Sequence, residues 1–173
     1  MTQATNTVRF VLDGKIVEAQ GKRRTTTVLD YLREQLHRTG TKEGCAEGDC
    51  GACVVMVGEL NAAGTGVDYV ATNACIQLLP SLDGKSVKTV ESLKKADGTL
   101  HPVQEEMIKC HGSQCGFCTP GMLTTLAAVL DVGDDGLHGA RGVLEEIFPA
   151  PLEGARVHPA DFRLQIRARS EEH

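Results

Sequence analysis

Short apolar runs separated by turn residues fill most of the first 90 residues of the chain. The runs are rich in Val, Ile and other β-prone side chains, which predicts strands. The five predicted strands are residues 8–12, 15–19, 53–60, 67–71 and 85–90. Asp13 and Gly14 lie between the first two runs, and this pair is a strong signal for a tight hairpin.

One helix is predicted between the second and third strands. Thr27 is its expected N-cap, Asp30 follows three residues later, and the helix is expected to end near Gly40. Its apolar face consists of Val28, Leu29, Leu32 and Leu36. Strands wrapped over one helix predict a compact α+β unit that ends near residue 90.

The pattern becomes helical after residue 91. Pro102 suits the first position of one helix, and a second helix is predicted with Thr119 as N-cap and Pro120 as its first residue. The apolar faces are formed by Val103, Met107 and Cys110 in one helix and by Leu123, Leu126, Ala127 and Leu130 in the other. Cys110 is therefore expected to be a buried apolar residue.

These patterns divide the chain into three regions, namely residues 1–90, residues 91–132 and a tail of residues 133–173. Periodicity weakens in the tail, which is rich in Gly, Ala, Arg and Pro. A short helix at 143–148 and a strand at 162–166 are the elements predicted there.

Composition narrows the classes of function. The chain has 173 residues, a net charge of −5 and a pI near 5.7, so nothing favours binding to nucleic acid. Aromatic residues make up only 3% and Trp is absent, which predicts a thin aliphatic core of the kind often stabilised by a bound metal. The N-terminus is polar and no apolar run approaches the length of a membrane span. A reducing, cytoplasmic setting is expected, where clustered cysteines bind metals more often than they form disulfides.

Four of the seven cysteines follow a recognisable spacing. Cys45, Cys50 and Cys53 are separated by four and then two residues, and Cys75 follows after an apolar segment. This is the spacing of plant-type [2Fe–2S] ferredoxins, in which four thiolates hold two bridged irons. Three ligands can come from one loop, but the fourth has to arrive from elsewhere in the fold. The four cysteines are therefore the predicted ligands of a first cluster.

Gly44, Gly48 and Gly51 alternate with these thiols. Glycine permits positive φ and close approach of the backbone, so the loop can aim several N–H groups at the cluster sulfurs. The alternative is a structural zinc site, which also uses cysteines at short spacings. Zinc sites usually have two separated cysteine pairs, and three cysteines in one glycine-rich loop favour iron–sulfur chemistry instead.

A second cysteine pair lies farther along the chain. Cys115 and Cys118 fall in a turn that enters the N-terminus of a predicted helix. The positive end of a helix dipole favours an anionic thiolate cluster. These two cysteines are the predicted ligands of a second cluster. Alternatively, they bind zinc, share a site with a ligand from a partner chain, or are free thiols.

The two cysteine segments carry a resemblance to a known family. Residues 44–53 read GCAEGDCGAC, residues 73–75 read NAC, and residues 111–121 read HGSQCGFCTPG. These motifs resemble the iron–sulfur subunit or domain of the molybdenum hydroxylases, and most closely the small subunit of bacterial xanthine dehydrogenase. The resemblance covers roughly residues 8–125, with the motifs in the same order as in the family.

The resemblance implies a fold and a function. It implies a β-grasp, ferredoxin-like [2Fe–2S] domain at residues 1–90, followed by a [2Fe–2S]-binding helical domain that starts at residues 91–132. It further implies electron transfer from a molybdopterin centre on a large subunit, through the clusters, to FAD on a further domain or subunit. Substrate would bind to the partner, so no catalytic residue is expected here, and Gln114 would lie near the pterin.

The chain also departs from the family. The family completes its second cluster with a Cys-x-Cys motif, whereas no cysteine follows Cys118 here. The second site is therefore expected to be incomplete and the helical domain to be only partly formed. Two other interpretations remain at this point: a zinc-stabilised binding module without a redox role, and a subunit altered by truncation or a frameshift.

Overall fold

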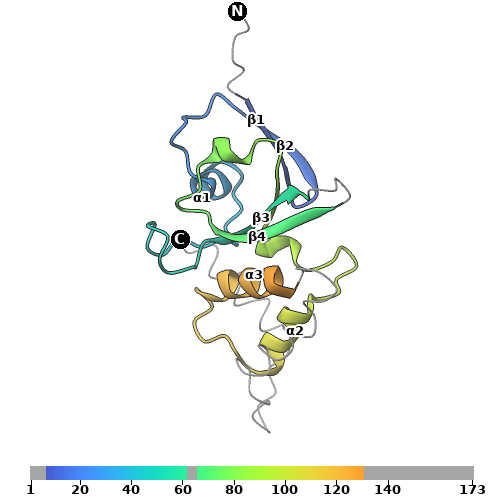
Figure 1. Ribbon diagram of the computed structural model, residues 1–173. Helices are drawn as coiled ribbons and strands as arrows, with labels where there is room; N and C mark the ends of the chain where they lie inside the picture. The colour runs from blue at the N-terminus through green and yellow to red at the C-terminus, as the bar shows by residue number, and fades with distance from the viewer. Residues whose placement is uncertain (1–6, 62–65, 131–173) are drawn as a thin grey trace, which may run out of the picture.

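The computed structural model describes residues 7–61 and 66–130 of the chain. The described residues contain one mixed sheet in the order β2-β1-β5-β3-β4 (Figure 1). Its strands are β1 (Thr7–Leu12), β2 (Lys15–Gln20), β3 (Val54–Leu60), β4 (Val67–Asn73) and β5 (Ser86–Lys88). β1 and β5 pair in parallel, and the other neighbouring strands pair antiparallel. The predicted α+β class with a ferredoxin-like sheet is confirmed.

The first hairpin forms as its turn residues predict. Asp13 and Gly14 both have positive φ, 49° and 79°, as a two-residue hairpin turn with the right twist requires. Leu12 pairs with Lys15 across this turn. The prediction made from the Asp-Gly pair is confirmed.

The helical segment after β2 is less regular than its sequence pattern. A short α1 (Val28–Asp30) runs directly into a π-helical turn η1 (Tyr31–Gln35). Thr27 is the N-cap as predicted, since its Oγ1 accepts a hydrogen bond from the Asp30 N–H at 3.1 Å. The predicted end near Gly40 is wrong, because the helix stops before His37, whose φ of 53° turns the chain away.

The last strand is shorter than predicted. β5 ends at Lys88, and Thr89 caps a 3-10 turn η3 (Val90–Ser92) by accepting a hydrogen bond from the Glu91 N–H. A second 3-10 turn, η2 (Leu79–Leu82), precedes β5. Residues 85–90, predicted as one strand, therefore contain the shorter β5 and the start of the connection to the helices.

Two helices follow, α2 (Pro102–Lys109) and α3 (Thr119–Leu130). Pro102 opens α2 as predicted, and His101 and Gln104 form a capping box before it. The N-cap prediction for Thr119 is wrong: Thr119 is already helical, because the Met122 N–H donates to the Cys118 carbonyl at 3.1 Å. The Thr119 hydroxyl lies instead 2.8 Å from Ser113 Oγ.

Cys110 also departs from its prediction. It is the C-cap of α2 and is only half buried, because the helix ends there and the buried face stops at Met107. The tail elements predicted at 143–148 and 162–166 lie outside the described residues.

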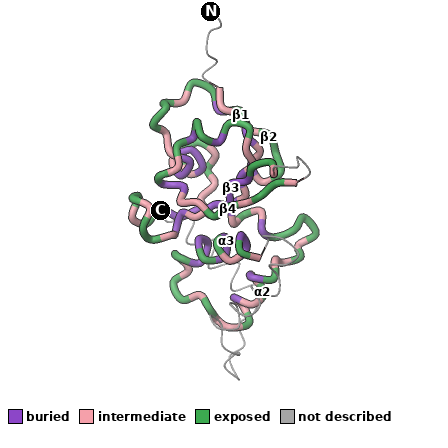
Figure 2. Tube along the Cα trace, in the orientation of Figure 1, coloured by how far each residue is buried: buried purple, intermediate pink, exposed green. Residues whose placement is uncertain are grey.

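The sheet separates two hydrophobic cores. Val55 and Val57 of β3 face the core that includes α1 and η1, whereas Met56 between them faces α3, because successive side chains on a strand point to opposite faces. Figure 1 shows α1 on one side of β3 and β4 and α3 on the other, and Figure 2 shows buried positions concentrated along these elements. No helix in the described part of the chain is long and apolar enough to cross a membrane.

Candidate metal centre

The first cysteine loop connects the helical segment to β3 and ends beside the last residue of β4. Val54 pairs with Asn73, which places the start of one strand against the end of the other. The Ala74 N–H donates to the Cys53 carbonyl at 3.2 Å just past this pair. The β3–β4 register therefore brings Cys75 to the loop that carries the other three thiols.

Backbone N–H groups converge on the sulfur of Cys45. The N–H groups of Glu47, Asp49 and Cys50 donate to Cys45 Sγ at 3.5, 3.3 and 3.4 Å. The N–H of Cys45 in turn donates to Cys50 Sγ at 3.4 Å. Hydrogen bonds to a thiolate stabilise its charge, and those from Cys50, Glu47 and Asp49 lower the pKa of Cys45 to about 6.

Cys75 has the opposite electrostatic environment. Burial, a hydrogen bond with the Cys53 thiol and the charges of Cys53 and Cys45 raise the pKa of Cys75 to about 11. Both Cys53 and Cys75 are buried, whereas Cys50 is exposed. Cys75 therefore lies beside Cys53, and Cys45 is near enough to Cys75 to add its charge.

The loop glycines fill two different roles. Gly48 and Gly51 have φ values of 87° and 70°, which a residue with a side chain rarely adopts. Gly44 has no positive φ but is needed for space, because a Cβ there would lie 2.7 Å from Cys50 Sγ. Ala46 takes a left-handed conformation without being glycine, with φ of 57°, so the loop is wound tightly around the Cys45 sulfur.

Asn73 joins β4 to the cysteine loop. Its Nδ2 donates to the Gly48 carbonyl at 2.6 Å, and the Cys53 thiol donates to its Oδ1 at 4.0 Å. The NAC motif includes this residue, but spacing alone did not assign it a role. Asn73 therefore holds the middle of the loop against the strand that supplies Cys75.

Cationic side chains hold the chain that leads into the loop. Arg33 Nη1 donates to the Thr41 carbonyl at 2.9 Å, and Lys42 Nζ donates to the Thr39 carbonyl at 2.9 Å. Lys42 is buried, and loss of hydration lowers the pKa of its ammonium group. Sequence reasoning missed both residues, because nothing in their spacing distinguishes them from surface cations.

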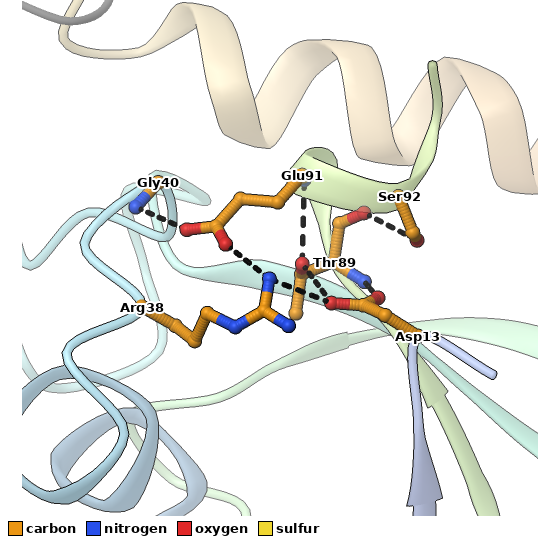
Figure 3. Close-up of polar contacts among 6 residues, drawn as sticks. All are labelled: Asp13, Arg38, Gly40, Thr89, Glu91 and Ser92. Carbon is orange, nitrogen blue, oxygen red and sulfur yellow. Dashed lines mark hydrogen bonds and ion pairs between the residues drawn. The ribbon is translucent and has the colours of Figure 1, made fainter. Parts of the chain in front are cut away.

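A second polar cluster ties the same segment to the turn of the first hairpin and to η3 (Figure 3). Arg38 contacts Glu91 Oε2 at 2.5 Å and Asp13 Oδ2 at 3.6 Å. Asp13 also accepts hydrogen bonds from the N–H and the hydroxyl of Thr89 at 2.8 and 2.9 Å. The Gly40 N–H donates to Glu91 Oε1 at 3.0 Å. This cluster therefore fixes the segment that leads into the cysteine loop to both the first hairpin turn and η3.

The second cysteine segment is more open. Cys115, Cys118 and the predicted pterin-facing Gln114 are all exposed, and Cys110 is half buried. Cys118 directly precedes α3, in the position predicted for a thiolate at a helix N-terminus. The structure thus places Cys115 and Cys118 in one turn, and of the other cysteines all but Cys110 are assigned to the first site.

The donor set of the first segment fits a [2Fe–2S] cluster. Cys45 Sγ receives three N–H hydrogen bonds, the Cys45 N–H donates to Cys50 Sγ, and Cys53 and Cys75 are shielded from water. Within the described ranges, no three His, Cys, Asp or Glu side chains surround a single point where one metal ion would be held. A two-iron cluster does not need such a group, because its four thiolates are shared between two metal atoms.

Comparison with known proteins agrees with this reading of the residues. Residues 10–77 match the 2Fe-2S iron-sulfur cluster binding domain family, and residues 89–145 match the [2Fe-2S] binding domain family. The second match extends past residue 125, where the resemblance seen in the sequence ended.

Relatives and solved structures point the same way. The chain is 44% identical over 128 residues to xanthine dehydrogenase of Drosophila subobscura, covering 74% of this chain and 10% of the relative. It is 44% identical over 121 residues to aldehyde oxidase 1 of Bos taurus, covering 70% and 9%. The aldehyde oxidoreductase of Desulfovibrio desulfuricans ATCC 27774 superposes with a TM-score of 0.62 at 33% identity, over 73% of this chain and 13% of that one.

The chain spans about a tenth of the length of the curated relatives it matches. The matched part contains both cysteine segments, and both family matches describe [2Fe-2S] binding. The chain therefore belongs to the iron–sulfur part of the molybdenum hydroxylase family, whose members include xanthine dehydrogenases and aldehyde oxidases.

Proposed function

We propose that this chain transfers electrons through a [2Fe–2S] cluster held by Cys45, Cys50, Cys53 and Cys75. The convergence of three backbone N–H groups on Cys45 Sγ is the observation that carries the proposal. A bound cluster supplies one-electron redox chemistry. The residues of the chain hold the thiolates, direct N–H dipoles at sulfur and exclude water on the side of the buried Cys53 and Cys75.

The proposed position in the enzyme follows from the relatives. Electrons pass from a molybdopterin centre on a large subunit, through this chain, to FAD on another domain or subunit of a xanthine dehydrogenase-like oxidoreductase. Substrate binds to the partner, and no residue of this chain is catalytic. Gln114 faces the molybdopterin partner in this proposal, which agrees with its exposure. The proposed setting is the reducing cytoplasm, where clustered cysteines bind metals more often than they form disulfides.

We divide the chain at residue 90, with the ferredoxin-like domain at 1–90 and the helical domain beginning at 91–132, because η3 starts the connection between the sheet and the helices. Residues 133–173 form the third region of this division. Cys115 and Cys118 form an incomplete second site, because the chain supplies no cysteine after Cys118.

Metal analysis of the purified full-length chain tests the proposal. We expect a brown protein with iron and acid-labile sulfide in equal amounts and an EPR signal that appears on reduction. A colourless protein that contains zinc in place of iron would exclude electron transfer and favour a zinc-stabilised binding module. Mixing the reduced chain with an FAD-containing partner of this enzyme class should then reoxidise it.

A further inference from the structure

The start of α3 presses directly on the backbone of the first cysteine loop. A Cβ added to Gly121 would lie 2.1 Å from the Gly51 carbonyl oxygen and 3.1 Å from the Ala52 Cα. Both atoms belong to backbone, so they cannot move aside as a flexible side chain would. No residue larger than glycine fits at position 121 without displacing the helix from the loop.

Phe117, in the turn that precedes α3, extends this contact to the thiols. A Cβ on Gly44 would lie 3.7 Å from Phe117 Cε1 and 2.7 Å from Cys50 Sγ. The ring therefore lies beside the backbone that flanks the Cys50 sulfur. Phe117 is 37% exposed, and the loop of residues 44–53 and the start of α3 lie on the same side of the molecule in Figure 1.

We propose that the second cysteine segment forms one wall of the first metal centre, with Phe117 as the shielding side chain and Gly121 as the residue that sets its distance. This inference rests on the proposed function, because it concerns the cluster held by the first cysteine set. The second segment then sets the reduction potential of the first centre, in addition to any metal that it binds itself.

The direction of the effect follows from solvation. Reduction adds an electron to a cluster that is already anionic with its four thiolates, and water stabilises the more highly charged state. Solvent exposure is one of the factors that set the potential of such clusters. Removing the Phe117 ring admits water near Cys50 and should make the first centre easier to reduce.

The test is a redox titration of the full-length protein carrying its cluster, followed by EPR and visible spectroscopy. For Phe117→Ala we expect the ratio of reduced to oxidised cluster, measured at the wild-type midpoint, to rise about threefold, which is about 30 mV for a one-electron couple. Phe117→Leu keeps an apolar cover and should restore most of the wild-type potential. Val129→Ala is the matched control, because Val129 is an apolar residue near the other end of α3 and is 47% exposed, so this variant should leave the potential unchanged.

Gly121→Ala provides a second variant that leaves the ring intact but pushes the helix from the loop. It should shift the potential in the same direction as Phe117→Ala and also lower thermal stability. A wild-type protein without iron would refute the proposed function. If the wild-type protein carries its cluster but Phe117→Ala has the same reduction potential, the inference about Phe117 is refuted and the proposed function is not.

Discussion

The two cysteine segments share a Cys-x-x-Cys spacing but differ in what surrounds it. Cys50 and Cys53 belong to a loop wound around a third thiol, and the end of β4 adds Cys75. Cys115 and Cys118 are both exposed in a turn before α3, and no cysteine follows them in the chain. Both segments therefore contain the same Cys-x-x-Cys motif. Only the first site gains a further cysteine from another secondary-structure element.

This difference shows where a four-thiolate site comes from. A loop can supply closely spaced ligands, but the remaining ligand depends on strand register or helix packing elsewhere. In the first segment, Val54 pairs with Asn73, and Asn73 also holds Gly48, so the register and the loop support each other. Spacing alone predicts a candidate ligand pair, and the fold decides whether it is completed.

The largest expected effect comes from removing the thiol that the sheet delivers. Cys75→Ala should abolish the first cluster, lowering iron from about two per chain to nearly none, because four thiolates are required. Loss of the metal should also lower thermal stability, since metal binding contributes to folding free energy. Iron analysis and thermal unfolding measure both effects.

Cys115→Ala is the matched control for Cys75→Ala and should leave the EPR signal of the first cluster in place. Equal loss of iron in the two variants would contradict the distinction between a complete and an incomplete site.

The iron content of the unmodified chain also tests whether the first site is complete and the second incomplete. We expect about two irons per chain and one EPR signal after reduction, because only the first site has four cysteines, three from its loop and Cys75. Four irons with two distinct signals would mean that the second segment obtains ligands other than cysteine from this chain. Anaerobic reconstitution with excess iron and sulfide before the measurement excludes incomplete loading.

A smaller effect is expected in the polar cluster that fixes the approach to the first loop. Asp13→Asn retains a residue that tolerates positive φ but removes the charge that faces Arg38 and Thr89. The side chain of Asp13 is 6% exposed, so the substitution should cost about 1.5–3 kcal/mol in the free energy of unfolding, the range for hydrogen bonds to charged groups.

Urea unfolding measures the Asp13→Asn effect, with Glu18→Gln as the control. Glu18 pairs with Arg9 on the surface, where both side chains are about half exposed or more, and its loss should cost at most about 1 kcal/mol. An Asp13→Asn cost no larger than that of Glu18→Gln would show that the cluster does not anchor the loop.

The smallest expected effect concerns the order of thiol reactivity in the iron-free protein. The pKa of Cys45 is lowered to about 6, so its reactive thiolate is already populated at pH 7. The pKa of Cys75 is raised to about 11, so this thiol stays protonated until far higher pH. Iodoacetamide labelling followed by mass spectrometry should modify Cys45 before Cys75, with a labelling midpoint near pH 6 for Cys45. The reverse order would contradict the hydrogen-bond arrangement of the loop.

Local chemistry made much of the fold predictable. Asp13 and Gly14 specify their hairpin, and Thr27 and Pro102 start their helices, because each signal acts within a few residues. The assignment of Cys45, Cys50, Cys53 and Cys75 as ligands rests on a similar local signal, the spacing typical of a two-iron cluster, and stays a prediction.

The remaining features depend on contacts between distant parts of the chain. The π-helical turn at Tyr31–Gln35 and the left-handed His37 carry no signal in hydrophobic spacing. Glu91 accepts from the Gly40 N–H, and Gly121 touches Gly51, but neither contact can be seen before the sheet and α3 are placed. Three other predictions were wrong for local reasons that hydrophobic spacing does not show: the φ of His37 ends the first helix early, Thr119 is already helical, and Cys110 is the C-cap of α2.

The uneven burial of the four thiols gives the first centre one open and one closed side. Cys53 and Cys75 face the interior, whereas Cys50 is open to solvent. Solvent and small solutes therefore reach this site from the Cys50 side. Because α3 packs against this same loop at Gly121, the start of α3 is one of the elements that limit access to the thiols.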